Sequence, residues 1–225
     1  MRKLIIGDLD KFTLEVNQMK EKEDTYLIRS LNDVDHLVLS HDDQVFFPMS
    51  KLPQVKSVDD PYVYFDLESY PFFQKAKEII TSDPHPQGVF RLRRKTRSTT
   101  TNDPIIVDDL FVVSSMFGSP KMVYVKRTAK DQSPLHIIVT VTFNCGTMAH
   151  LDYTFMDEEV IELEWSGNKK IIEFTSMEAD PFATKKDHTL IYSIDSVLDH
   201  SHPVNDSLLK RLDDIRNLVT RGDQR

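Results

Sequence analysis

The sequence is poor in features that define several large classes of protein. Cys145 is its single cysteine, so no disulfide can form within the chain and a cysteine-based zinc site would lack its ligands. Basic residues are outnumbered, 28 Lys and Arg against 36 Asp and Glu, and the net charge of −8 repels nucleic acid on average. We therefore expect a protein of a reducing compartment, the cytoplasm, that does not bind nucleic acid.

Long apolar runs are also missing. The run at the N-terminus, Leu4 to Ile6, is far shorter than the ~7–15 residues of a secretion signal. The longest largely apolar stretch, Leu110 to Phe117, is interrupted by serines and falls short of the ~20 residues that span a bilayer. No membrane association is expected. The 225 residues, 40% of them hydrophobic, suffice for one large or two small domains.

The first part of the chain has the pattern of an α/β unit. Leu4 to Ile6 is typical of a short buried strand, and Asp10 can cap a following helix. The apolar positions of that helix recur at helical spacing, at Phe12, Val16 and Met19. Further strands are expected at residues 26–28 and 36–39. Chain breakers between Pro48 and Pro61 predict a loop, so we place the end of the first domain near Tyr70, giving a domain of residues 1–70.

The remainder, residues 71–225, predicts a large sheet with flanking helices. Helices are expected over 72–82, over 107–117 and from Asn205 or Asp206 onward. The expected strands cover residues 87–97, 121–127, 135–143, 148–156, 160–165, 170–174 and 189–194. Strict alternation along 137–143 and 149–155 indicates one buried and one polar face. We expect a mostly antiparallel sheet.

Gly7 stands where a phosphate-binding glycine loop would begin, after a strand and before a helix. The second and third glycines of that fingerprint are replaced by Leu9 and Phe12, whose side chains obstruct the approach of pyrophosphate and the packing of the helix. Asp8 and Asp10 add negative charge where phosphate would lie. Gly7 is the one residue of the dinucleotide-binding fingerprint that the sequence retains, and normal dinucleotide binding is not expected here.

Two charged clusters are candidates for chemistry. Arg91 and Arg93 belong to a dense basic strand and either bind a phosphate or carboxylate ligand or pair with the protein's own acidic surface. Asp108 and Asp109 lie in an otherwise apolar helix and form either an acid/base pair or a first turn stabilised by the helix dipole.

Other reactive residue types lack partners in the sequence. His200 and His202, even with Asp199, are too few and too local for a zinc site, so no metal is expected. Ser114 and Ser115 lack the glycines of a nucleophile elbow, and Cys145 has no identifiable base. No nucleophile is expected either.

The segments Ser69 to Ile80, Gln87 to Arg93 and Val107 to Pro120 follow one another along the chain. Their order resembles the glucose-fructose oxidoreductase and inositol dehydrogenase (Gfo/Idh/MocA) family. Ser69 to Ile80 is similar to the start of that family's second domain, and Gln87 to Arg93 to the domain's first strand. Val107 to Pro120, closing with Phe117-Gly118-Ser119-Pro120, resembles its active-site helix and turn. The segments 135–155, 161–174 and the final helix continue the pattern, so about two thirds of the chain is covered.

This resemblance implies a Rossmann domain that binds NAD or NADP, action on sugars or polyols, and a sheet that often forms a dimer interface. The chain departs from that pattern in several places. Its first 70 residues resemble a condensed Rossmann domain, the glycine fingerprint is broken, and the family's Glu-Lys-Pro segment with its catalytic lysine has no counterpart. Counted back from Gly118, the family's histidine position holds Asp108 and its later aspartate position holds Phe111.

We therefore expect a condensed Rossmann-like α/β unit followed by an α+β domain with an open sheet. The predicted function is that of an oxidoreductase homologue, catalytically altered or inactive, whose sheet serves homodimerisation or binds a small molecule such as a sugar or polyol. Two alternatives stay open: an NAD(P)-dependent sugar or polyol dehydrogenase with unconventional cofactor binding, and a regulatory subunit of a full-length family member.

Overall fold

The computed structural model of the chain describes residues 2–12, 24–28, 42–54, 58, 60–97, 103–129, 133–176 and 190–223. It divides into two compact units, the first made of Met1–Phe73 with Ile191–Lys210 and the second of Gln74–Leu190 with Arg211–Arg225. The chain therefore returns to the first unit after completing most of the second. Among the described helices, none combines the length and the apolar character needed to cross a membrane.

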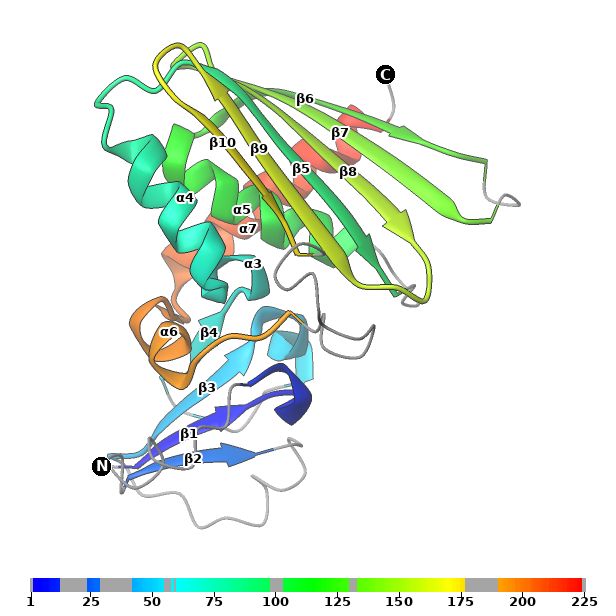
Figure 1. Cartoon of the computed structure of the whole chain (residues 1–225). Coiled ribbons are helices and arrows are strands. Elements are labelled where there is room, and N and C mark those ends of the chain that lie inside the picture. The colour runs from blue at the N-terminus through cyan, green and yellow to red at the C-terminus, as the bar shows by residue number, and fades with distance from the viewer. Residues whose placement is uncertain are drawn as a thin grey trace, which may run out of the picture. The chain divides into compact units, whose positions relative to one another are not determined.

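The first unit is built on a five-stranded sheet with the order β11-β4-β3-β1-β2 (Figure 1). The strands are β1 (Lys3–Ile6), β2 (Thr25–Ile28), β3 (Gln44–Pro48), β4 (Tyr62–Tyr64) and β11 (His202–Pro203). β1 pairs in parallel with β2 and β3, and β3 with β4, while β11 adds an antiparallel edge. The sequence indicates β1 and β2, but not β3, β4 or β11, whose short aromatic or proline-bounded runs have no clear alternation.

The helices of the first unit are short: η1 (Leu9–Lys11), η2 (Met49–Gln54), α3 (Asp66–Ser69) and α6 (Ile194–Asp199). Asp8, not Asp10, caps η1, and Phe12 after it is extended, so Phe12 does not open the expected helix. The rest of that helix, with Val16 and Met19, and the expected strand at 36–39 lie outside the described residues. The expected loop at 48–61 contains η2.

The strand predicted over residues 189–194 is wrong over its described part. Tyr192 makes only an isolated bridge, and α6 begins at Ile194. The reason is local capping, because the Ser193 hydroxyl accepts a hydrogen bond from the Ser196 amide and starts a helix instead.

The second unit is built on a six-stranded sheet with the order β10-β9-β5-β8-β7-β6 (Figure 1). The strands are β5 (Gly88–Thr96), β6 (Pro120–Arg127), β7 (Leu135–Phe143), β8 (Met148–Phe155), β9 (Val160–Gly167) and β10 (Ile171–Thr175). β5 and β8 pair in parallel, and every other neighbouring pair is antiparallel. The strand ranges agree closely with the alternating runs of the sequence.

The longer helices are α4 (Pro71–Thr81), α5 (Asp103–Phe117) and α7 (Asp206–Gly222). Asn205 caps α7 by accepting from the Leu208 amide, as its position before the apolar stripe predicts. α5 ends at Gly118, which adopts φ +84. In the second unit, α5 and α7 lie against one face of the six-stranded sheet (Figure 1).

The six-stranded sheet has an inner and an outer face, as the alternation predicts. The inner positions of the antiparallel neighbours β7 and β8 are fully buried, at Ile137, Val139, Val141, Ala149, Leu151 and Tyr153. Burying each large apolar side chain contributes about 1.5–3 kcal/mol, so this face holds most of the second unit's core. The outer face carries half-buried and exposed side chains, and no described helix of this unit covers it.

Candidate functional site

The sheet of the first unit has a topological switch point at β1. β2 lies on one side of β1 and β3 on the other, and all three run parallel. In open sheets of this kind, ligands bind in the crevice outside the carboxyl ends of the strands at such a point. The residues that follow β1 therefore decide whether a nucleotide can be held.

Gly7, the first residue after β1, is already crowded by aromatic side chains. A Cβ built on it would lie 2.5 Å from the Tyr64 hydroxyl oxygen and 2.9 Å from the Phe12 ring. The Tyr64 hydroxyl donates a hydrogen bond of 2.9 Å to the Ile6 carbonyl at the end of β1. Gly7 is needed here for the protein's own packing, because the Tyr64 and Phe12 side chains lie directly against the turn that follows β1.

Tyr192 completes this aromatic cluster. Its amide donates to the Lys11 carbonyl at 2.9 Å, and its ring packs edge-on against Phe12 at a centroid distance of 4.8 Å. The rings of Tyr64 and Tyr70 lie 6.0 and 5.6 Å from it. Burial, together with the nearby Asp66 carboxylate, raises the pKa of both Tyr64 and Tyr192 above the usual tyrosine range. Both hydroxyls stay protonated at neutral pH.

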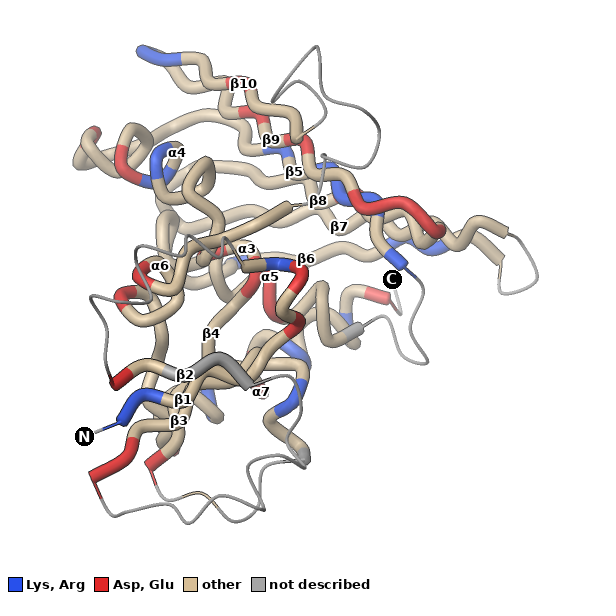
Figure 2. Tube along the Cα trace, turned by 60° about the horizontal axis from the view of Figure 1, so that its bottom comes forward, with Lys and Arg blue, Asp and Glu red and all other residues tan. Residues whose placement is uncertain are grey.

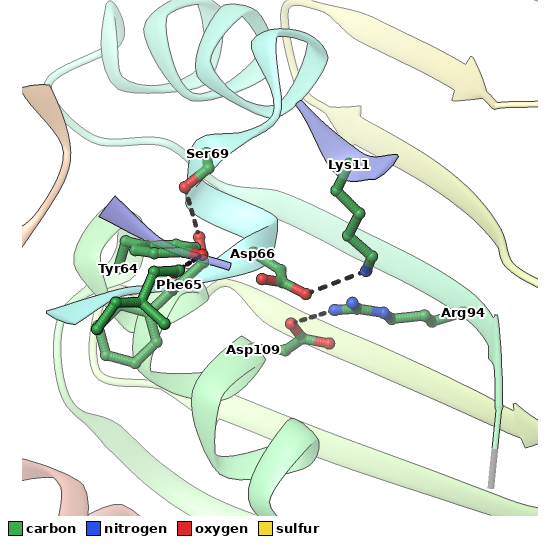
Figure 3. Close-up of polar contacts among 8 residues, drawn as sticks. Lys11, Tyr64, Phe65, Asp66, Ser69, Arg94 and Asp109 are labelled. Carbon is green, nitrogen blue, oxygen red and sulfur yellow. Dashed lines mark hydrogen bonds and ion pairs between the residues drawn. The ribbon is translucent and has the colours of Figure 1, made fainter. Parts of the chain in front are cut away.

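The polar residues around this crevice do not suit phosphate either. Asp8 and Asp10 are exposed on η1, and the Asp8 carboxylate accepts a hydrogen bond from the Asp10 amide, where a phosphate oxygen would compete for the same donor. The ammonium of Lys11 lies 3.4 Å from Asp66 (Figure 3). The described residues of the first unit thus do not fit a dinucleotide in the usual manner.

In the second unit, the candidate Asp109 lies in a buried ion pair. It points from α5 to Arg94 on the inner face of β5, with 2.8 Å between a guanidinium nitrogen and a carboxylate oxygen (Figure 3). Their side chains are only 3% and 2% exposed. Its neighbour Asp108 is half-buried. The structure therefore separates the two aspartates. It pairs Asp109 with Arg94, which the sequence predicts only as a member of the basic strand.

Tyr153 lies beside this pair. It stands opposite Arg94 in the register of β5 and β8 and is fully buried. Burial first, and then the charge of Asp109, raises the pKa of the Tyr153 hydroxyl well above its usual value. A phenol in this environment cannot act as a base near neutral pH, and a carboxylate held by a buried guanidinium is not poised to exchange a hydroxyl proton.

The remaining positions of α5 are also engaged in packing. The Arg211 guanidinium lies over the Phe111 ring, 4.8 Å from its centroid. The Ser114 hydroxyl is buried and donates to the Leu110 carbonyl, whereas Ser115 is exposed. Neither serine has the arrangement of a nucleophile.

The candidate ligand residues Arg91 and Arg93 lie on the outer face and pair across the strands. Arg91 meets Glu164 and Arg93 meets Glu162, each at 2.5 Å, along neighbouring strands that carry both signs of charge (Figure 2). His136 lies 3.2 Å from Asp152 on the same face. The alternative of pairing with the protein's own acidic residues is therefore the one observed.

A shallow groove runs along this outer face. Its volume is about 530 Å³, and its walls come from β5, β8, β9 and β10. Arg91, Arg93, His150, Glu162 and Glu164 line it together with Glu173. The charged side chains that line the groove carry both signs, and Leu92, Leu163 and Phe174 add apolar surface between them.

The last sequence candidates are dispersed. The His200 ring bonds the Ser196 carbonyl, and His202 pairs with the buried Glu68 at 2.7 Å, each from the first unit. Cys145 is exposed, and its thiol contacts the Phe117 carbonyl in the second unit. Across the described ranges, His, Cys, Asp and Glu form no group of three suited to a metal.

Comparison with known proteins gives a likeness of fold without a likeness of sequence. No protein-family model matches the sequence, and no curated protein matches it. A solved myo-inositol dehydrogenase from Corynebacterium glutamicum aligns with 100% of this chain and 96% of its own, with a TM-score of 0.63 and 9% identity.

Two other solved structures agree. A probable dehydrogenase from Thermotoga maritima covers 99% of this chain and 90% of its own, at a TM-score of 0.52 and 13% identity. A dehydrogenase from Chromobacterium violaceum covers 77% of this chain and 72% of its own, at a TM-score of 0.54 and 9% identity. These neighbours are Gfo/Idh/MocA-type dehydrogenases, so the resemblance predicted from the order of segments is confirmed at the level of the fold.

Proposed function

Because the chain has the fold of Gfo/Idh/MocA-type dehydrogenases, we propose that it is a catalytically altered homologue of these oxidoreductases. In this proposal it does not transfer hydride to NAD or NADP, and the outer face of its six-stranded sheet serves homodimerisation. The fold alone does not decide activity, because function resides in the site. The proposal rests on the residues that occupy the two places where the chemistry would be done.

The crowding of Gly7 is the single observation that carries the loss of cofactor chemistry. Tyr64 and Phe12 occupy the space next to the first glycine, and they are themselves held by a hydrogen bond to Ile6 and by the ring of Tyr192. Moving them would uncover a buried core, so a ligand that needs the space beside Gly7 would have to displace part of the fold. The buried pair of Asp109 and Arg94 supports the same conclusion for the proton-transfer site.

The outer face supports homodimerisation by its pattern. Two neighbouring rows run across all six strands: Lys126, Ile138, Asp152, Arg93, Glu162 and Thr175 form one, and Tyr124, Thr140, His150, Arg91, Glu164 and Glu173 form the other. Basic, acidic and uncharged side chains occur together in each of these rows. A surface with both signs of charge can pair with itself about a two-fold axis, and moderately polar faces of this kind are usual in interfaces.

A turnover assay tests the loss of activity. The purified protein is mixed with NAD or NADP and with myo-inositol and related polyols, and reduction of the cofactor is followed by absorbance. We expect no turnover above a buffer control. Turnover at ordinary enzymatic rates that disappears in Asp108→Ala, with the fold intact, would instead establish the dehydrogenase with unconventional cofactor binding.

Sedimentation tests the dimer. Ile138 on the outer face is 38% exposed, and Leu209 on α7 is 37% exposed, so the two give a matched pair of substitutions. We expect Ile138→Glu to shift the protein toward monomer and Leu209→Glu to leave it dimeric. A wild-type protein that sediments as a strict monomer contradicts this part of the proposal, and a monomer that binds a full-length family member favours a regulatory subunit.

A further inference from the structure

The outer face of the six-stranded sheet carries its charges strand by strand. The outward side chains of β5 include the basic Arg91, Arg93 and Lys95, and those of β9 include the acidic Glu162 and Glu164. In the strand order, β5 and β8 occupy the centre, with β9 and β10 on one side and β7 and β6 on the other (Figure 1). Each of two neighbouring strands therefore presents one sign of charge, and the charge pattern has a direction across the sheet.

A third row on this face carries no charged side chain. It lies beside the two charged rows, near the start of β5, and crosses all six strands: Met122, Thr142, Met148, Val89, Ser166 and Ile171. Ile171 is 73% exposed, the largest exposed fraction of any large apolar side chain in the described ranges. A partner that covers this face must therefore match an uncharged row as well as the charges beside it.

A second copy of the chain can lie on this face in two ways that keep the strands of the two sheets aligned. If the two-fold axis crosses the strands, each strand lies over its own copy. The basic β5 then meets the partner's β5, and the acidic β9 meets the partner's β9. Like charges face each other across such an interface and oppose association.

The other axis runs along the strands, between β5 and β8, and each row then meets the same row of the partner in reverse order. β5 lies over the partner's β8, so that Arg93 faces the partner's Asp152. In the uncharged row, Ile171 faces the partner's Met122. Within the three rows, no Lys or Arg faces a Lys or Arg, and no Asp or Glu faces an Asp or Glu.

We propose that the homodimer forms about this second axis and that Arg93 of each copy pairs with the partner's Asp152. This arrangement rests on the proposed homodimerisation of the outer face and adds which residues meet. Arg93 lies 2.5 Å from Glu162 of its own chain, and because a guanidinium carries several N–H donors, it can also donate to a second carboxylate. Asp152 is half-buried and lies 3.2 Å from His136. The two equivalent pairs lie at the centre of the interface, on either side of the axis.

Charge reversal at the two positions tests this arrangement by sedimentation. In Arg93→Asp two carboxylates meet at each contact, and in Asp152→Arg two guanidinium groups meet, so we expect each variant alone to be a monomer. Mixed in equal amounts, the two variants should form a heterodimer, because the new carboxylate of one chain faces the new guanidinium of the other. An effect within one chain cannot explain this rescue, since Arg93 and Asp152 are also neighbours within each chain and each variant keeps its unfavourable pair.

Arg91→Asp is the matched control for Arg93→Asp. Arg91 also points outward on β5, and its side chain is 49% exposed against 59% for Arg93. In the proposed arrangement Arg91 faces the partner's His150, not the partner's Asp152. A mixture of Arg91→Asp with Asp152→Arg has the same total charge as the first mixture. We expect it to associate at least about tenfold more weakly, the effect of one close charge pair across an interface.

Two results would overturn the arrangement while the wild-type protein is still a dimer. One is an Arg93→Asp protein that dimerises as tightly as the wild type, and the other is equal association of the two mixtures. A wild-type monomer would instead contradict the homodimer itself, and the arrangement with it. Should a charge-reversal variant not fold, Ile138→Lys and Ile138→Glu replace the mixtures, because Ile138 faces the partner's Glu162 in this arrangement. The lysine variant should then stay dimeric and the glutamate variant should not, and equal behaviour of the two overturns the arrangement.

Discussion

Removing either partner of the buried ion pair between Arg94 and Asp109 should destabilise the second unit severely. The side chains are 3% and 2% exposed, and they join β5 to α5 across the core. In Arg94→Met, the Asp109 carboxylate stays buried without its cation. Stranding one charge of a buried pair costs about 3–5 kcal/mol. At about 2–4 °C per kcal/mol for a chain of this size, the unfolding midpoint should fall by roughly 6–20 °C.

The control lies on the same strand. Arg91 is the same residue type, but it faces outward, and its pair with Glu164 is 49% and 36% exposed. A surface pair contributes about 0–1 kcal/mol, so Arg91→Met should change the midpoint by only a few degrees when both Arg variants are made in the Ile138→Glu background, which removes the proposed dimer contact. Trp165, the single tryptophan, is buried in β9 of the second unit, so its fluorescence follows the unfolding of the unit that holds both pairs.

The double variant separates a stranded charge from lost packing. Because a buried pair replaced by apolar residues of similar volume is often neutral or stabilising, Arg94→Met combined with Asp109→Leu should recover most of the lost stability. The reasoning is refuted if Arg94→Met is no worse than Arg91→Met, or if the losses of the two single variants simply add in the double variant.

Two further perturbations test the crevice and the buried hydroxyls. Gly7→Ala should lower the free energy of unfolding by about 1–3 kcal/mol through overpacking. Adding Tyr64→Phe should restore part of this loss, because it removes the hydroxyl that lies 2.5 Å from the new Cβ. Denaturant melts measure both variants, and a Gly7→Ala protein as stable as the wild type would contradict the packing. Since the folded-state pKa of Tyr153 is raised, its stabilising contribution is complete below the unfolded tyrosine pKa of about 10 and is lost as the pH rises beyond it. The free energy of unfolding should therefore fall above about pH 10, less steeply in Tyr153→Phe, and an equal slope in the two proteins would refute the assignment.

The sheet of the second unit could be predicted from the sequence because its signal is local. Alternation along residues 137–143 and 149–155 places one set of side chains inside, and those residues are buried. The cap at Asn205 and the apolar stripe after it fix α7 in the same way. The spacing of apolar residues and the capping of a helix each depend on a few neighbouring residues. Both can therefore be predicted from the sequence of a single strand or helix.

The first unit was harder to predict because its strands are short and its contacts are long-range. β3, β4 and β11 carry 5, 3 and 2 residues, too few for a period, and β11 joins β4 from the far end of the chain. The strand at 189–194 was predicted from the β propensity of its apolar residues. In the structure, Ser193 caps a helix instead, and α6 begins at Ile194.

The candidate sites show the same division. The sequence predicts an obstructed turn after Gly7, and the structure places the Phe12 ring beside Gly7. Tyr64 and Tyr192, which also lie in this cluster, come from distant segments and carry no motif. The pair of Arg94 and Asp109 had a usable signal: each is a charge at a buried position of an otherwise apolar pattern, and the signs are opposite. Opposite charges at core positions of two different elements indicate a buried pair, because neither charge is stable in a core alone.

In our proposal, this chain keeps the fold of its solved neighbours but not their chemistry. In the first unit, Tyr64 and Phe12 crowd the turn after β1, and in the second unit Asp109 of α5 is paired with Arg94. We infer that such packing contacts stabilise each unit and leave neither the space nor the free groups that hydride transfer requires.

Thermal unfolding in the presence of NAD, NADH, NADP and NADPH at millimolar concentration tests the central claim most directly. A nucleotide at about 100 times its dissociation constant would add about 2.7 kcal/mol of stability, a shift of several degrees. We predict that none of the four moves the unfolding midpoint. A clear shift produced by one nucleotide and not by the others would contradict the account and return the chain to the cofactor-binding dehydrogenases.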